Sequence, residues 1–148
     1  LGVAEIVPFI SERINVKLNQ ENKIKKQQRW QRLAEAASKQ CGRIQLPKVG
    51  EILSFQDLIQ SFSRFDLVLL AYELESGTDL KRSLRKSFKE NKLKSILAVV
   101  GPEGGFSAAE VKAMQQVGAQ SVSLGKNILR TETAAISMLA MMQYELLS

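Results

Sequence analysis

The chain has 148 residues, 45% of them hydrophobic, which is enough for one domain with a buried core. Because the chain has a single cysteine, it cannot form an internal disulfide framework. Because it has no histidine, metal sites and acid–base sites built on histidine are excluded. No apolar run reaches the length of a membrane span. The net charge of +6 is concentrated in residues 1–43, which predicts either a polyanionic partner such as nucleic acid or a solvated basic helix face. No signal peptide is visible, so we expect a cytoplasmic location.

The first part of the chain alternates between strand-like and helical patterns. Residues 3–10 predict a strand, residues 22–41 a helix, residues 44–53 a short strand with a turn, and residues 54–62 a brief helix. The apolar residues on one side of the first helix are expected to face the core: Ile24, Leu33, Ala34, Ala37 and Cys41.

Two strongly apolar strands dominate the second part of the chain. Residues 66–73 and 95–101 do not alternate apolar with polar positions, as expected of strands buried on both faces of a parallel sheet. A basic amphipathic helix at 79–91 lies between them, and a strand at 120–125 and an almost entirely apolar helix at 131–147 follow. The order predicts an α/β fold, a mostly parallel sheet flanked by helices, with the last helix covered by the sheet and by another subunit.

A glycine-rich break follows the second of these strands. In this glycine loop, residues 99–107 (VVGPEGGFS), three glycines and a proline surround one carboxylate, Glu103. Ser107 and Glu110 have the spacing of a capping box, so a helix starts there. Ligands of open α/β folds bind beyond the carboxyl ends of strands, so the loop either binds a ligand or is a plain turn. It matches neither the phosphate-binding loop nor the dinucleotide fingerprint, and its acid favours a nucleoside or a cation.

A second loop, residues 124–134 (LGKNILRTETA), also leaves a strand and enters a helix. Thr131 is a suitable N-cap for that helix, and Arg130 and Glu132 flank it. The guanidinium of Arg130 matches a carboxylate, a phosphate or a base edge, which makes it a candidate ligand-binding group unless it pairs with Glu132 or Glu103.

These two motifs together resemble those of a known family. GPEGGFSxxE followed by LGxxILRTETA resembles the RsmE-type ribosomal RNA uridine-N3 methyltransferases of the SPOUT superfamily, and RWQRLAEAASKQCGRIQLP at 29–47 extends the resemblance over nearly the whole chain. Asn127 and Lys39 depart from it, since Arg and Glu are common there. We expect residues 1–148 to be the SPOUT methyltransferase domain. We also expect an N-terminal PUA-like RNA-binding domain and the first part of the catalytic domain to be missing, which agrees with the start at Leu1 without an initiator methionine.

The resemblance implies a fold, a cofactor and a partner. The α/β domain would thread its C-terminal segment through a trefoil knot, form a homodimer through the last helix, and bind S-adenosylmethionine against the backbone of the knot loops, without a metal. The cofactor-binding residues that the resemblance implies are Leu70, Tyr72, Glu73, Val100, Gly101, Pro102, Gly104, Gly105, Leu124, Gly125, Ile128, Leu129, Arg130 and Thr133.

The implied reaction methylates N3 of a uridine in small-subunit ribosomal RNA. A proton must leave N3 while negative charge develops on O2 and O4, so the site needs a base and a charge stabiliser. In a chain without histidine, Glu132 and Glu103 are the candidate bases, and Arg130 is the candidate stabiliser.

A basic stretch is the candidate RNA-binding surface, with Trp30 either stacked on a base or packed in a core or interface. Its cationic residues are Lys23, Lys25, Lys26, Arg29, Arg32 and Arg43.

Three alternatives remain at this point. One is a sister enzyme of the same superfamily that methylates a ribose 2′-OH or another base. Another is a non-catalytic RNA-binding module of the same fold, against which the presence of Arg130, Glu132 and the loop glycines argues. A generic nucleotide-binding α/β domain is disfavoured because both phosphate motifs fail.

Overall fold

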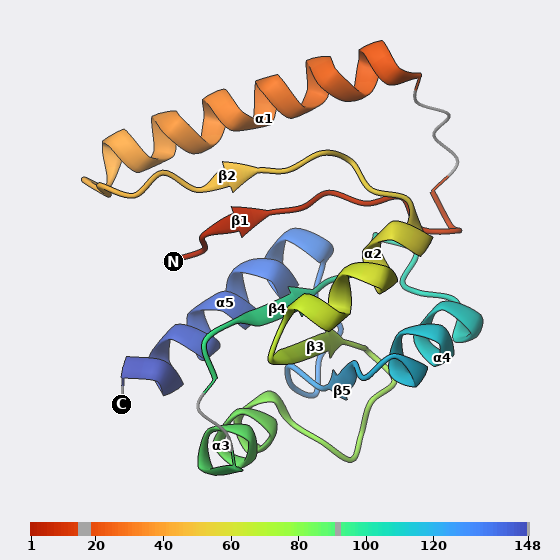
Figure 1. The fold of residues 1–148 in the computed structure, drawn as a ribbon. Helices are drawn as coiled ribbons and strands as arrows, with labels where there is room; N and C mark the ends of the chain where they lie inside the picture. The colour runs from red at the N-terminus through yellow and green to blue at the C-terminus, as the bar shows by residue number, and fades with distance from the viewer. Residues whose placement is uncertain (15–18, 91–92, 148) are drawn as a thin grey trace.

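A three-stranded parallel sheet forms the centre of the fold (Figure 1). The computed structural model describes residues 1–14, 19–90 and 93–147. In the sheet order β4-β3-β5, β3 spans Leu67–Ala71, β4 spans Ile96–Val99 and β5 spans Gln120–Val122. Because β3 pairs in parallel with both neighbours, the predicted parallel sheet is confirmed.

Helices cover both faces of this sheet, which confirms the predicted α/β class. On one face lie α2 (Phe55–Ser61), a 3₁₀ turn at Phe62–Arg64 and α4 (Ala108–Gln116), and on the other lie α3 (Leu80–Glu90) and α5 (Thr131–Leu147). The expected last residue of the third predicted helix, residue 91, falls outside the described residues. None of the described helices is long and apolar enough to cross a membrane.

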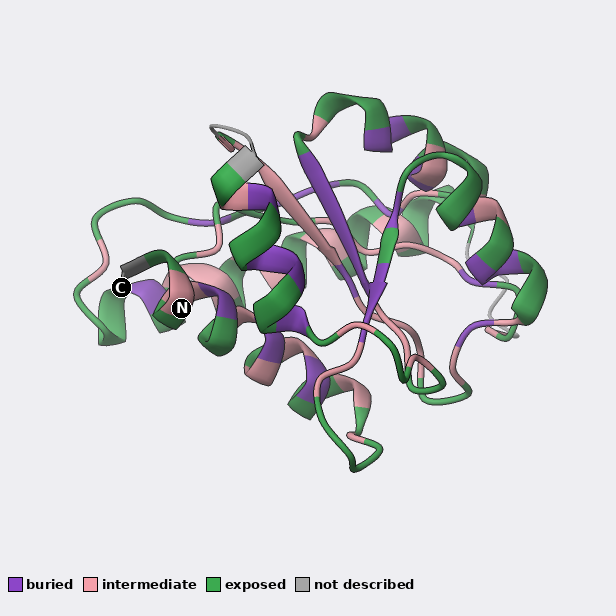
Figure 2. Ribbon diagram, turned by 90° about the horizontal axis from the view of Figure 1, so that it is seen from below, coloured by how far each residue is buried: buried purple, intermediate pink, exposed green. Residues whose placement is uncertain are grey.

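Strand β3 is buried on both faces, which explains why its sequence does not alternate. Val68 and Leu70 belong to the hydrophobic cluster with α2 and α4, whereas Leu67 and Leu69 belong to the cluster with α3 and α5. All four side chains are at most 5% exposed, and Figure 2 shows β3 buried along most of its length beside the half-buried β4. The loop that leaves β3 is therefore anchored on a buried strand. The expectation that β4 is also buried on both faces is wrong, because β4 lies at the edge of the sheet and is only half-buried.

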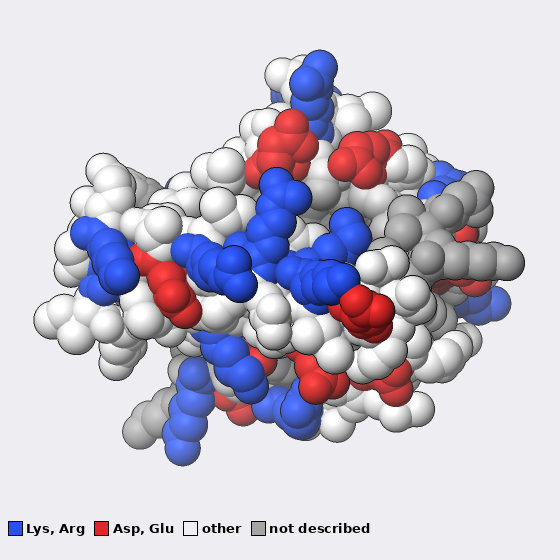
Figure 3. All heavy atoms as spheres, turned by 90° about the horizontal axis from the view of Figure 1, so that it is seen from above, with Lys and Arg blue, Asp and Glu red and all other residues white. Residues whose placement is uncertain are grey.

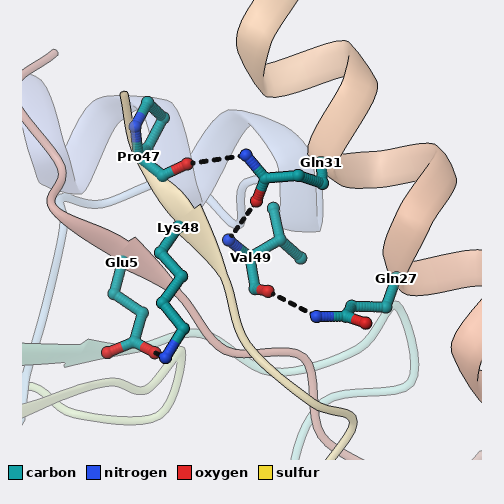
Figure 4. A network of polar contacts seen from close by, with 6 residues as sticks. All are labelled: Glu5, Gln27, Gln31, Pro47, Lys48 and Val49. Atoms are coloured by element: carbon teal, nitrogen blue, oxygen red, sulfur yellow. Dashed lines mark hydrogen bonds and ion pairs between the residues drawn. The ribbon is translucent and has the colours of Figure 1, made fainter. Parts of the chain in front are cut away.

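A second, smaller layer lies above the central sheet in Figure 1. It consists of the parallel strands β1 (Glu5–Ile6) and β2 (Lys48–Val49) and the long helix α1 (Gln20–Gln40). Figure 4 shows how α1 holds the edge of β2 through side-chain amides: Gln31 accepts from the Val49 amide at 2.8 Å and donates to the Pro47 carbonyl at 3.3 Å. Gln27 donates to the Val49 carbonyl at 2.9 Å, so two glutamines satisfy an otherwise unpaired strand edge.

The predicted core face of α1 is wrong. Ile24 and Leu33 are 46% and 59% exposed, Ala37 and Cys41 are exposed as well, and only Ala34 is half-buried. The physical reason is that α1 contacts β2 through polar glutamines, while Leu33 and Ala34 only line an open apolar groove beside β1 and β2. The strand expected at 3–10 is likewise shorter than predicted, since only β1 and a bridge between Phe9 and Leu53 form there.

Removal of the Asp66 carboxylate is expected to lower stability in a pH-dependent way. Its Oδ2 accepts from the amides of Lys94 and Ser95 at 2.8 and 2.9 Å, joining the starts of β3 and β4. The Lys94 amide is the main cause, and the Ser95 amide the next, of a pKa below the ordinary value of 3.8. Folding thus favours the ionised form, so the stabilisation is present above pH 3.8 and is lost as the pH falls through the lower folded pKa. Thermal melts of Asp66→Ala should show a deficit at pH 7 that shrinks on acidification; a deficit independent of pH would contradict this account.

Candidate active site

A pocket lies at the carboxyl ends of the three central strands. Ala71 ends β3, while Gly101 and Leu124 follow β4 and β5, and all three line a cavity of about 90 Å³. This is the position expected for a ligand site in an open α/β sheet. The glycine loop and the second loop both contribute to its wall.

Two residues of the glycine loop hold backbone positions that only glycine suits. Gly105 has a φ of +65°, and a Cβ there would lie 2.4 Å from Oε1 of Glu73. A Cβ on Gly101 would lie 2.9 Å from the Phe106 ring. The turn is closed by the Gly105 amide, which donates to the Pro102 carbonyl at 2.9 Å. The glycines therefore let the backbone itself form part of the pocket wall.

The far end of the glycine loop is anchored by the predicted capping box, which is confirmed. Ser107 Oγ accepts from the Glu110 amide at 3.1 Å, and Glu110 Oε2 accepts from the Ser107 amide at 2.9 Å. Phe106 is buried, and its ring stacks on Phe9 with centroids 6.1 Å apart. Phe106 and Ser107 therefore fix the chain that follows the exposed residues Glu103 and Gly104.

The second loop is joined to the glycine loop by Thr131. Its hydroxyl donates to the Gly101 carbonyl at 3.0 Å instead of capping α5, so the predicted N-cap is wrong. The helix begins at Thr131, and the Arg130 carbonyl accepts its first hydrogen bond, from Ala134 at 2.8 Å. Arg130 therefore occupies the N-cap position, and the Thr131 hydroxyl is free to join the two loops.

Two charged side chains, Glu73 and Lys126, line the pocket. The three predicted catalytic residues, Arg130, Glu132 and Glu103, are exposed and directly adjoin lining residues in the sequence. Within the described part of the chain, Arg130 forms no ion pair with either glutamate, so the alternative of a structural salt bridge is absent there. The three candidate catalytic residues are therefore exposed and next to the pocket along the chain, but they are not part of its wall.

The predicted cofactor-binding residues divide into two groups. Those that line the pocket are Tyr72, Glu73, Val100, Gly101, Pro102, Gly105, Leu124, Gly125, Ile128 and Leu129. Those that do not are Leu70, which is fully buried in the core, and Gly104, Arg130 and Thr133, which are exposed.

Six lining residues are not among the cofactor-binding residues that the resemblance implied, although four of them lie in the same loops; the six are Ala71, Ser123, Lys126, Asn127, Thr131 and Ala134. The signal for Lys126 was present, since it is a cation inside the second loop, close to the strand end. Ser123 and Ala134 are small residues at the end of a strand and in the first turn of a helix, and nothing in their pattern marks them.

The family comparison decides what kind of domain this is. A model of the RNA methyltransferase domain matches residues 1–143. The chain belongs to this family.

Two curated relatives of this RNA methyltransferase domain carry the same name. It is similar to the ribosomal RNA small subunit methyltransferase E of Bacillus subtilis, with 37% identity over 98% of this chain and 57% of the relative. The protein of the same name from Mesomycoplasma hyopneumoniae is 33% identical over 94% of this chain and 57% of the relative. The chain thus spans little more than half the length of these curated relatives.

A solved structure adds a comparison in three dimensions. The domain is similar to a ribosomal RNA small subunit methyltransferase E from Neisseria gonorrhoeae bound to S-adenosyl methionine, with a TM-score of 0.80 and 32% identity. The match covers 97% of this chain and 55% of that one.

Helix α1 of this RNA methyltransferase domain carries a group of basic residues. Figure 3 looks down on the α1 side of the molecule, where a band of Lys and Arg crosses the surface among a few acids. Lys25, Lys26, Arg29 and Arg32 are exposed, whereas Lys23 and Arg43 are half-buried. Trp30 is half-buried, with the Lys26 ammonium 5.9 Å from its ring centroid. The tryptophan is therefore engaged within the domain, and the cations around it remain accessible.

Proposed function

We propose that this domain transfers a methyl group from S-adenosylmethionine to N3 of a uridine in small-subunit ribosomal RNA, in the cytoplasm. The observation that carries the proposal is the convergence of two loops on one pocket, joined by the hydrogen bond from Thr131 to Gly101. The names of the relatives support the substrate class, and the cofactor in the Neisseria structure supports the choice of methyl donor.

The groups around the pocket suit this cofactor. Glu73 and Lys126 offer opposite charges, which match the ammonium and the carboxylate of a methionine moiety. The pocket is open to solvent at lining side chains such as Ile128, which is 81% exposed, so a bound nucleoside would also cover these side chains. When bound, S-adenosylmethionine supplies an electrophilic methyl group on its sulfonium.

The charged residues around the pocket supply the acid–base chemistry of the proposal. Glu132 or Glu103 takes the N3 proton of the uridine, and the guanidinium of Arg130 stabilises the negative charge that develops on O2 or O4. Arg130 places a cation at the N-cap of α5, beside the positive end of the helix dipole, and this destabilises the helix by about 0.3–1 kcal/mol. A residue that is unfavourable for the helix is better explained by a role in ligand binding than by one in folding.

The RNA would bind across the exposed basic face of α1. A triple variant that replaces Lys26, Arg29 and Arg32 with alanine is expected to weaken RNA binding and to reduce the slope of log affinity against log salt by about two to three, since each phosphate contact contributes about 0.7–0.9. The measurement is RNA affinity at several salt concentrations, with affinity for S-adenosylhomocysteine unchanged.

A matched control removes the same charge from another helix. Arg82, Lys86 and Lys89 are exposed on α3, and their replacement with alanine should leave the salt slope nearly intact. If both triple variants reduce the slope equally, α1 is only a solvated basic surface.

A homodimer and a trefoil knot are also part of this proposal. A homodimer through α5 is supported by exposed apolar residues on this helix, with Ile136 59% and Met141 42% exposed. A trefoil knot of the SPOUT type is implied by the family resemblance, and the two loops that would form it are in direct contact. Sedimentation of the protein across a concentration series tests the dimer.

The chemical outcome separates this function from its alternatives. Small-subunit RNA is incubated with enzyme and cofactor, digested to nucleosides and analysed by mass spectrometry. Uridine methylated at N3 supports the proposal, whereas uridine methylated at another atom, methylated ribose or another methylated base indicates a sister enzyme. A protein that binds RNA but neither binds S-adenosylhomocysteine nor transfers a methyl group would be a non-catalytic module.

A further inference from the structure

Arg13 contacts the glycine loop from a distant part of the sequence. Its Nη1 donates a hydrogen bond to the carbonyl of Gly104, 91 residues further along the chain. Cβ and Cδ of Arg13 lie 3.7 Å from the position that a Cβ on Gly104 would take, so the aliphatic stem covers the open side of this glycine. Because neither Arg13 nor Gly104 lines the pocket, the contact supports the loop from outside.

The neighbouring residue fixes the end of the same loop. The Glu12 amide donates to Oε1 of Glu110 at 2.9 Å, and Oε2 of Glu12 accepts from the Ser107 hydroxyl at 2.8 Å. Glu110 is only 1% exposed, and its other carboxylate oxygen accepts from the Ser107 amide. A buried carboxylate that accepts two amide hydrogen bonds makes this end of the loop rigid.

The peptide between Gly104 and Gly105 depends on Arg13. Its oxygen accepts from Arg13, and its N–H donates to the Pro102 carbonyl at 2.9 Å, so both sides of one planar unit are held. Gly105 has the left-handed φ of +65° and lines the pocket, while Glu103 immediately precedes the held unit. Without the Arg13 contact, the plane could rotate and move both residues.

We propose that Arg13 is a positioning residue that preorganises the glycine loop for cofactor binding by fixing the Gly104–Gly105 peptide. This inference rests on the proposed function, because it names the pocket as the cofactor site. A loop already held in its bound conformation loses less conformational freedom when the ligand arrives, and this raises affinity without a new contact to the ligand.

Two measurements on Arg13→Ala, Arg13→Lys and the control Arg64→Ala test the role. Amide hydrogen exchange at Gly105 needs no ligand, and it should be about tenfold faster in Arg13→Ala, since a hydrogen bond from a charged group is lost. Calorimetric titration should show about tenfold weaker binding of S-adenosylhomocysteine in the same variant. Arg13→Lys should restore the slow exchange and the affinity, because an ammonium can donate the same hydrogen bond. The control Arg64→Ala changes an exposed arginine far along the chain and should match the wild type.

The outcomes separate this role from general stability and from the proposed function. Exchange of the β3 amides should be unchanged in Arg13→Ala, which excludes global destabilisation as the cause. Unchanged exchange at Gly105 would overturn the positioning role, and faster exchange with unchanged affinity would overturn its link to the ligand. If the wild type does not bind S-adenosylhomocysteine, the proposed function fails, while the exchange measurement still decides whether Arg13 holds the loop.

Discussion

Replacement of Gly105 with alanine is expected to weaken binding of S-adenosylhomocysteine by about tenfold or more and to destabilise the domain by about 1–2 kcal/mol. The loss of stability follows from its φ of +65°, which is costly for any residue with a Cβ. The loss of affinity follows because a Cβ would lie 2.4 Å from Oε1 of Glu73, so this carboxylate must leave its place in the pocket wall. Calorimetric titration and urea unfolding measure the two effects.

The adjacent glycine provides the control. Gly104 lacks the left-handed φ, and a Cβ there would meet only the stem of Arg13 at the ordinary contact distance of 3.7 Å. Gly104→Ala should therefore bind S-adenosylhomocysteine and unfold nearly as the wild type does. Equal effects of the two substitutions would mean that the exact backbone geometry of the loop does not matter, and the account of the pocket wall would be wrong.

Replacement of Arg130 with alanine is expected to reduce the rate of methyl transfer by about 10²–10³-fold, the usual effect of removing one group that stabilises developing negative charge. Affinity for S-adenosylhomocysteine should not change, because Arg130 does not line the pocket. Stability should stay the same or rise by up to about 1 kcal/mol, since a cation is removed from the start of α5. Single-turnover methyl transfer to small-subunit RNA at saturating cofactor measures the rate.

The specificity of this effect is tested with Lys112→Ala, which removes an exposed cation from α4. This variant should transfer methyl groups at the wild-type rate. If Arg130→Ala does so as well, the assignment of charge stabilisation to Arg130 is wrong. If Arg130→Ala instead loses affinity for S-adenosylhomocysteine, the side chain binds the cofactor, as the resemblance implied.

The central sheet and the position of the site could be predicted because local patterns determine them. The apolar run in β3 has no polar alternation because both of its faces are covered, and burial of this kind leaves a direct mark on the sequence. The capping box at Ser107 and Glu110 is equally local, since its two hydrogen bonds join residues three positions apart. The carboxyl-end rule predicted a ligand site at the strand ends, and the structure has a pocket there.

Features that depend on distant partners could not be predicted. The apolar stripe of α1, with Ile24 and Leu33, has a helical period, yet the period does not say whether another element covers it. Thr131 has the residue type of an N-cap, but its hydroxyl donates to Gly101, which lies 30 residues earlier. Arg13 carries no local signal at all, because its partner Gly104 is brought to it only by the fold.

The predictions for Gly105 and Arg130 depend on S-adenosylmethionine binding in the pocket between the glycine loop and the second loop. Calorimetric titration of this chain with S-adenosylhomocysteine, the stable product of that cofactor, tests it most directly. We expect saturable binding of one molecule per chain, weakened in Gly105→Ala and retained in Gly104→Ala. Absence of binding by a chain that circular dichroism and thermal melting identify as folded would contradict this expectation.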